Sequence, residues 1–131
     1  MNTELDKLYD DILGITRLTL APYMKKGAYR QTEGKRKCCD IYYIDKEITK
    51  KDKNEGFIMR IRQDVDKINI CLGQSRENLN IPKGYPRRKR DSDQYAPNQW
   101  EFDIYLDKPY DWPLVFLLAV QVAEFQQTRN R

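Results

Sequence analysis

Apolar residues recur at three- and four-residue intervals along the first twenty residues of the chain. This spacing predicts an α-helix with one core-facing side, made of Leu5, Leu8, Tyr9, Ile12, Ile15 and Leu18. Acidic residues crowd the first turns of this segment, where the helix dipole favours negative charge. Pro22 is expected to end or kink the helix.

Further along, the pattern changes to the two-residue alternation that is typical of half-buried strands. Residues 38–44, 57–62 and 67–72 are rich in strand-forming residues, and the short stretch 64–66 predicts a hairpin between the last two. The clearest alternation covers residues 100–106, where apolar Trp100, Phe102, Ile104 and Leu106 occupy every second position. Each of these segments is therefore predicted to form a strand.

The last segment predicts a second helix, with Asp111 as its N-cap and Pro113 in its first turn. Between residues 114 and 123 the only polar residue is Gln121, so this helix is apolar nearly all round. One small sheet cannot cover every side of such a helix. We therefore expect a homodimer interface formed by Trp112, Leu114, Phe116, Leu117 and Val120.

Together the segments predict an α+β fold in the order helix, three strands, long basic loop, fourth strand, helix. The simplest architecture is an antiparallel four-stranded sheet with the two helices on one face. A chain of 131 residues is near the common size of one domain. We expect a single domain over residues 1–131, with the basic loop 74–99 inserted before the last strand.

The chain contains no histidine, which removes the commonest metal ligand and the usual proton carrier near neutral pH. The three cysteines have no zinc-binding spacing. No cofactor, metal site or catalytic residue is predicted, and we expect a protein that is not an enzyme. The alternative is a carboxylate-metal nuclease. Its metal ligands would come from one of two acidic pairs, Asp64 with Asp66 or Glu101 with Asp103, because Mg²⁺ prefers carboxylate oxygens.

Positive charge is concentrated in two segments. Residues 24–37 hold six Lys or Arg against one Glu, and residues 74–99 hold six against three acidic residues, in a chain with a net charge of +4. Both segments also contain tyrosines, which stack on unpaired bases while Lys and Arg contact phosphates. The alternative is that each charged run is only a solvated loop.

This charge pattern favours a small non-enzymatic binding protein that contacts a polyanion, either nucleic acid or a nucleoprotein complex, through two basic loops. The predicted binding residues are Arg30, Lys35, Arg36, Lys37, Lys83, Tyr85, Arg87, Arg88, Lys89, Arg90 and Tyr95. The alternative is a protein-interaction or inhibitor module, of the phage or mobile-element type, whose basic loop blocks an acidic or nucleic-acid-binding surface of a target protein.

The expected location is the cytoplasm, without membrane association. The N-terminal residues are acidic where a signal peptide would be basic, and no apolar run is long enough to span a bilayer.

Overall fold

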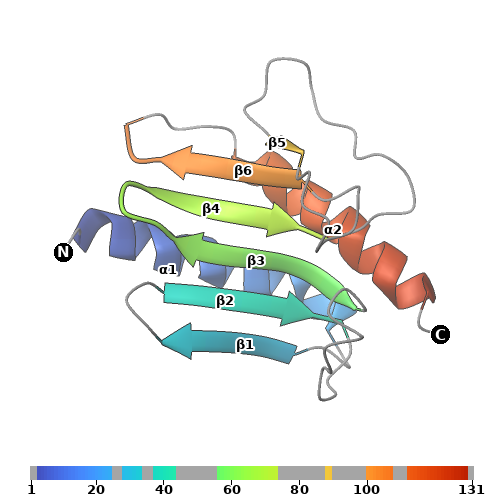
Figure 1. Ribbon diagram of the computed structural model, residues 1–131. Helices are drawn as coiled ribbons and strands as arrows, with labels where there is room; N and C mark the ends of the chain where they lie inside the picture. Colours follow the sequence, from blue (N-terminus) through green and yellow to red (C-terminus); the bar gives the residue numbers. More distant parts are fainter. Residues whose placement is uncertain are drawn as a thin grey trace.

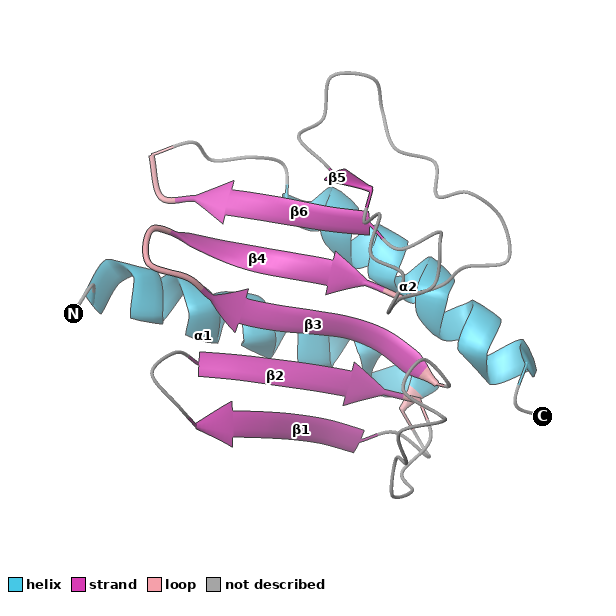
Figure 2. Cartoon of the chain, viewed as in Figure 1, coloured by secondary structure: helices cyan, strands magenta, loops and turns pink. Residues whose placement is uncertain are grey.

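The computed structural model describes residues 3–24, 28–33, 37–43, 56–73, 88–89, 100–107 and 112–129. Within these residues the chain forms two long helices and one antiparallel sheet (Figure 1). The helices are α1 (Thr3–Leu20), which continues into the short 3₁₀ helix η1 (Ala21–Tyr23), and α2 (Trp112–Arg129). Both helices pack against the same face of the sheet, and the opposite face, here called the helix-free face, carries no helix formed by the described residues (Figure 2). The predicted α+β class is confirmed.

The four predicted strands lie side by side in the sheet. They are β2 (Lys37–Tyr42), β3 (Phe57–Gln63), β4 (Lys67–Leu72) and β6 (Trp100–Tyr105). The strand order across the sheet is β1-β2-β3-β4-β6-β5, and every neighbouring pair is antiparallel. The order helix, four strands, helix is therefore as the sequence predicts.

Two further strands lie inside the segments that were expected to be basic loops. They are β1 (Ala28–Glu33), which pairs with β2, and the two-residue β5 (Arg88–Lys89), which pairs with β6. The sequence of β1, AYRQTE, has no apolar alternation. Periodicity alone could not reveal either strand, because each is defined by its pairing with a neighbour.

The helix-facing side of the sheet forms the core. Cys39, Ile61, Ile70 and Phe102 follow one another across the four central strands, and each is almost completely buried. The burial of such aliphatic and aromatic side chains is the main stabilising contribution to a fold of this size.

Helix α1 buries a stripe that differs from the predicted one. Ile15 and Leu18 are exposed, at 40% and 78%, so their assignment to the core was wrong. Leu13, Thr16 and Leu20 face inward instead. The hydroxyl of Thr16 donates a hydrogen bond to the carbonyl of Ile12 at 2.7 Å, which lets a polar residue occupy a fully buried position.

A β-bulge bends the sheet where β2 meets β3. Ile41 pairs with Met59 and Tyr42 pairs with Phe57, so Ile58 is an extra residue on β3. Both Ile58 and Met59 enter the core, whereas the ring of Phe57 lies 5.6 Å from that of Tyr42. The bulge thus moves Phe57 off the core-facing side on which simple alternation would place it.

Gly73 makes this bend possible. Its N–H donates to the carbonyl of Ile58 at 2.8 Å, and a Cβ at position 73 would overlap the carbonyl oxygen of Phe57. Only glycine allows the end of β4 to approach β3 this closely.

Most of the apolar surface of α2 is covered within the chain. Its buried residues are Val115, Phe116, Leu118, Ala119, Val122, Ala123 and Gln126. Leu117 is 62% exposed, and it shares the outer side of the helix with polar Gln121 and Glu124. Of the residues expected at a homodimer interface, Phe116 is therefore used by the core and Leu117 is exposed. Among the described residues, no helix is both long enough and apolar enough to cross a membrane.

Candidate polyanion-binding surface

Four of the eleven predicted binding residues lie in the described part of the chain. Arg30 is in β1, Lys37 begins β2, and Arg88 and Lys89 form β5. The remaining predictions lie outside the described residues: Lys35, Arg36, Lys83, Tyr85, Arg87, Arg90 and Tyr95.

The sheet separates the two basic segments. Strand β1 is at one edge and β5 is at the other, with four strands between them (Figure 1). Neighbouring strands are about 4.8 Å apart, so the two edges are separated by roughly 24 Å along the sheet. The described parts of the two segments therefore do not converge on one patch.

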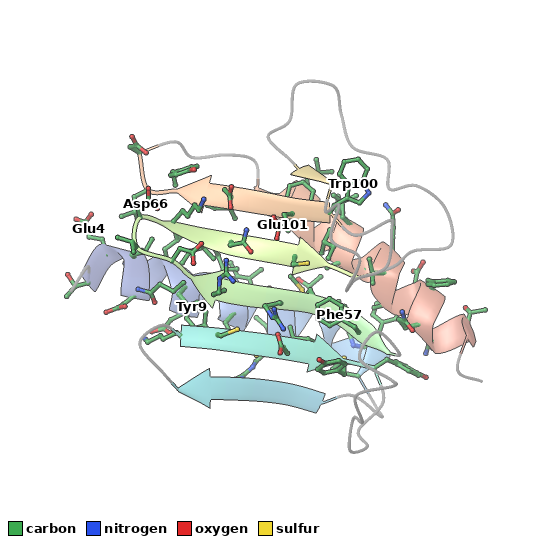
Figure 3. All side chains as sticks on the ribbon, in the orientation of Figure 1. Glu4, Tyr9, Phe57, Asp66, Trp100 and Glu101 are labelled. Carbon is green, nitrogen blue, oxygen red and sulfur yellow. The ribbon has the colours of Figure 1, made fainter. Side chains whose placement is uncertain are left out.

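The strand register connects both edges to the helix-free face. Position 30 lies opposite Asp40, which lies opposite Arg60. At the other edge, position 88 lies opposite Glu101, at the end of β6 where Figure 3 shows Glu101 and Trp100. Positions directly opposite in an antiparallel ladder share a face. Positions 30 and 88 thus belong to the helix-free face, next to acidic residues.

The cations at the centre of this face are already paired with carboxylates. Arg60 binds Asp40 through two hydrogen bonds, with 2.6 Å between Nε and Oδ1 and 3.3 Å between Nη2 and Oδ2. The side chains of this pair are only 29% and 18% exposed. Two parallel hydrogen bonds in a partly buried position make this the strongest described ion pair on the sheet.

Arg62 and Lys67 are also paired with carboxylates. Arg62 Nε lies 3.0 Å from Oδ1 of Asp64, and Lys67 Nζ lies 3.4 Å from Oδ2 of Asp103. Asp103 also accepts a hydrogen bond of 2.9 Å from the amide of Asn69, which is almost fully buried. The centre of the helix-free face is therefore charged but balanced, and its cations are occupied.

Lys37 points to the other side of the sheet. Its Nζ lies 3.5 Å from Oδ1 of Asp10 on α1 and 5.8 Å from the centre of the Tyr9 ring. Both members of the Lys37–Asp10 pair are about half exposed or more, at 49% and 64%. Such pairs contribute well under about 1 kcal/mol, so a phosphate could compete with Asp10 for this lysine.

The buried groups beneath Lys37 stay neutral. Burial, with a smaller effect of Cys39 and other neighbours, raises the pKa of Tyr9 well above its usual range. Burial also raises the pKa of Cys39 to about 11, against an opposing effect of Arg17. All three cysteines carry thiols. A neutral, fully buried thiol is a poor nucleophile and a poor metal ligand, which favours a packing role for Cys39.

Two of the four carboxylates considered for a metal site, Asp64 and Asp103, are bound to other side chains. Arg62 holds Asp64, while Lys67 and Asn69 hold Asp103. Asp66 lies in the exposed hairpin turn between β3 and β4 (Figure 3). Within the described ranges, no three Cys, Asp or Glu side chains are grouped so that they could hold a metal ion.

Sequence reasoning missed the ion pairs of the helix-free face. The signal was present, because charged and amide residues alternate with apolar ones in β3, β4 and β6. What the sequence lacked was the register between strands, which places Asp40 beside Arg60 and Asn69 beside Asp103.

No family model, curated protein or solved structure matches this chain.

Proposed function

We propose that this protein is a small non-enzymatic binding protein that contacts nucleic acid, alone or within a nucleoprotein complex, through the basic segments at the two edges of its sheet. The main contacts come from Arg87, Arg88, Lys89 and Arg90, with further contacts from the segment 24–37. The tyrosines of these segments stack on unpaired bases. A cytoplasmic location is part of this proposal.

The separation of charge between the centre and the edges of the sheet supports the proposal. The described cations of β3 and β4 are bound to carboxylates, whereas the two edge segments hold twelve Lys or Arg against four acidic residues. A phosphate backbone responds to local surplus charge and to the counterions that its binding releases. The edge segments provide such a surplus, and the centre does not.

The geometry favours two separate contacts over one continuous track. Asp40, Glu101 and Asp103 lie on the helix-free face between the edges, and carboxylates repel a phosphate backbone. A duplex advances about 3.4 Å per base pair, so it would need roughly seven base pairs to reach from edge to edge. A shorter duplex therefore contacts one edge at a time.

A fluorescence anisotropy titration tests this function. Labelled single- and double-stranded DNA and RNA are titrated with the protein at several salt concentrations. We expect binding to all of them, with affinity falling as salt rises, and two short oligonucleotides bound per chain. Absence of binding at low salt would contradict the proposal.

The second candidate is a protein-interaction or inhibitor module that covers an acidic or nucleic-acid-binding surface of a target. The observation that favours it is a six-residue strand, β1, at the edge of the sheet. A protein that binds no nucleic acid in the titration, yet binds an acidic partner, would be of this kind.

Self-association belongs to the same proposal, through Trp112, Leu114, Phe116, Leu117 and Val120. Because Phe116 is only 7% exposed, Leu117 is the described residue of this set that is best placed for a contact between copies. A Leu117→Glu variant that sediments as a monomer, beside a dimeric wild type, would support a homodimer.

A further inference from the structure

The two edges of the sheet differ in length. Strand β5 has two residues, whereas β1 has six and pairs with β2 along its whole length. Among the residues that the structure describes, β1 has no strand on its outer side (Figure 1). A very short edge strand offers few backbone groups to another chain, but a six-residue edge strand presents about three N–H and three C=O groups.

Three of the devices that protect an edge strand, a proline, a bulge and very short length, are absent from β1. It contains no proline, and its pairing with β2 runs without a register shift from Ala28↔Tyr42 to Glu33↔Lys37. Prolines, bulges and very short length are the devices that usually prevent a further strand from adding to a sheet. At the opposite edge the short length of β5 serves this purpose.

We propose that the outer edge of β1 binds an extended, acidic segment of a partner protein, which adds to the sheet as a further antiparallel or parallel strand. This mode of binding is known as β-augmentation, and its affinity comes from main-chain hydrogen bonds. It does not depend on nucleic-acid binding by Arg87 to Arg90 at the other edge.

The charge around β1 determines the kind of partner. The segment 24–37, which contains β1, holds six Lys or Arg and one Glu. A second copy of this chain would bring two such segments together, and like charges at an interface are unfavourable. An acidic strand is attracted by the same charge.

The backbone of β1 also distinguishes a peptide from a nucleic acid. An edge strand offers donors and acceptors in alternation. Phosphate oxygens accept hydrogen bonds but do not donate them, so a phosphate backbone lying along β1 would give the outward carbonyls no donors. An extended peptide satisfies both kinds of group, and its acidic residues complement the net positive charge of the segment 24–37.

The test uses the full chain and a short labelled peptide in which valine alternates with glutamate. A peptide with lysine in place of glutamate is the matched control. We expect the acidic peptide to bind with an affinity that falls as salt rises, and the basic peptide not to bind. Equal binding of both peptides, or binding of neither, would overturn the proposal.

Two variants, Gln31→Pro and Thr32→Pro, locate the binding edge. In a strand, neighbouring N–H groups point in opposite directions, so one of these prolines removes a bond to β2 and the other removes an outward donor. The variant that keeps the wild-type melting temperature is the outward one. It should bind the acidic peptide about tenfold more weakly or worse, because it loses a donor and presents a proline ring to the incoming strand.

If both variants unfold, amide hydrogen exchange of the wild-type chain provides the same test. We expect the outward amides of β1 to exchange more slowly once the acidic peptide is bound. Unchanged exchange in β1 with peptide bound would place the contact elsewhere and overturn the proposal.

Separate titrations with DNA and with the acidic peptide distinguish the two proposals. Peptide binding without nucleic-acid binding would contradict the proposed function and leave the edge-strand site intact. Nucleic-acid binding without peptide binding would support the proposed function and overturn the edge-strand site. A dimeric wild type that becomes monomeric in the outward proline variant would show that a second copy occupies β1, which would also overturn the proposal.

Discussion

The centre of the helix-free face and the edges of the sheet use positive charge in different ways. At the centre, Arg60, Arg62 and Lys67 are each held by a carboxylate in a position that the strand register defines. At the edges, the segments that contain β1 and β5 carry far more cations than acids. The central charges are thus balanced by acids within the sheet, whereas the edge segments carry a surplus of positive charge.

The comparison shows why net charge alone is a poor guide to a binding surface. A count of Lys and Arg includes those in β3 and β4 equally with those at the edges. Only the contacts distinguish a cation that is already bound from one in a segment with few acids.

The largest effect is expected at Gly73, where the end of β4 packs closely against β3. In Gly73→Ala the new Cβ would overlap the carbonyl oxygen of Phe57, so the backbone of β3 or β4 must shift. We expect a loss of roughly 2–3 kcal/mol in the free energy of unfolding. Urea denaturation provides the measurement.

Gly14→Ala is the control for this change. Position 14 is in α1, and a Cβ there would meet no atom within 4 Å. Because alanine favours a helix over glycine, we expect this variant to be more stable than the wild type by up to about 1 kcal/mol. Equal losses in both variants would contradict the close packing of β4 against β3 at Gly73.

The next largest effect on stability is expected from the removal of a partly buried ion pair, with an exposed pair as the control. Asp40→Asn removes the carboxylate that binds Arg60 through two hydrogen bonds in a partly buried position, and we expect a loss of about 2 kcal/mol. Asp10→Asn removes the exposed partner of Lys37, and we expect less than about 0.5 kcal/mol. Thermal denaturation of both variants checks the difference, and equal costs would contradict it.

The Asp40→Asn variant also provides a test of binding. Asp40→Asn removes a negative charge from the helix-free face, so short oligonucleotides should bind this variant somewhat more tightly than the wild type. Weaker binding by a variant that remains folded would show that the acids of this face do not repel the ligand.

A smaller effect is expected at alkaline pH, from the buried thiol of Cys39. Burial raises its pKa from the usual 9.0 to about 11, so the folded state favours the neutral thiol. This contribution is fully present below pH 9 and is lost as the pH rises towards 11. At about pH 9.5 the loss is below about 1 kcal/mol. Tyr9, whose pKa is also raised, acts in the same direction at higher pH.

Melting temperatures measured between neutral and alkaline pH test this prediction. Cys39→Ala is the matched variant, because it removes the thiol. Its melting temperature should be lower than that of the wild type at neutral pH, owing to the lost packing, but should fall less steeply above pH 9. Parallel curves for the two proteins would assign the alkaline loss to other groups.

The sequence was sufficient to predict the elements that carry a strong periodic signal. Both helices, four of the strands and the antiparallel class follow from local patterns such as the alternation in residues 100–106. The pattern failed where tertiary contacts decide. It did not reveal β1, whose residues alternate only weakly, or the rotation of α1 that buries Leu13 and exposes Leu18.

The candidate site was only partly predictable for a similar reason. The basic segments are visible in the sequence, but their places at opposite edges follow from the strand order. The prediction that α2 is apolar on more sides than one sheet can cover neglected its contact with α1 and η1. The sequence pattern shows which residues of the helix are apolar, but the packing of neighbouring elements determines how many sides of the helix are covered.

The most direct test of the central claim compares two quadruple alanine variants in the anisotropy titration. One replaces Arg87, Arg88, Lys89 and Arg90, and the other replaces Lys46, Lys50, Lys51 and Lys53, in a segment where four acids balance these four lysines. Both variants lose the same charge. We predict that the first weakens nucleic-acid binding and lowers the salt slope by up to about 0.7 per lost phosphate contact on single strands, while the second changes both much less. Equal effects of the two variants, or undiminished binding by a folded first variant, would contradict the account.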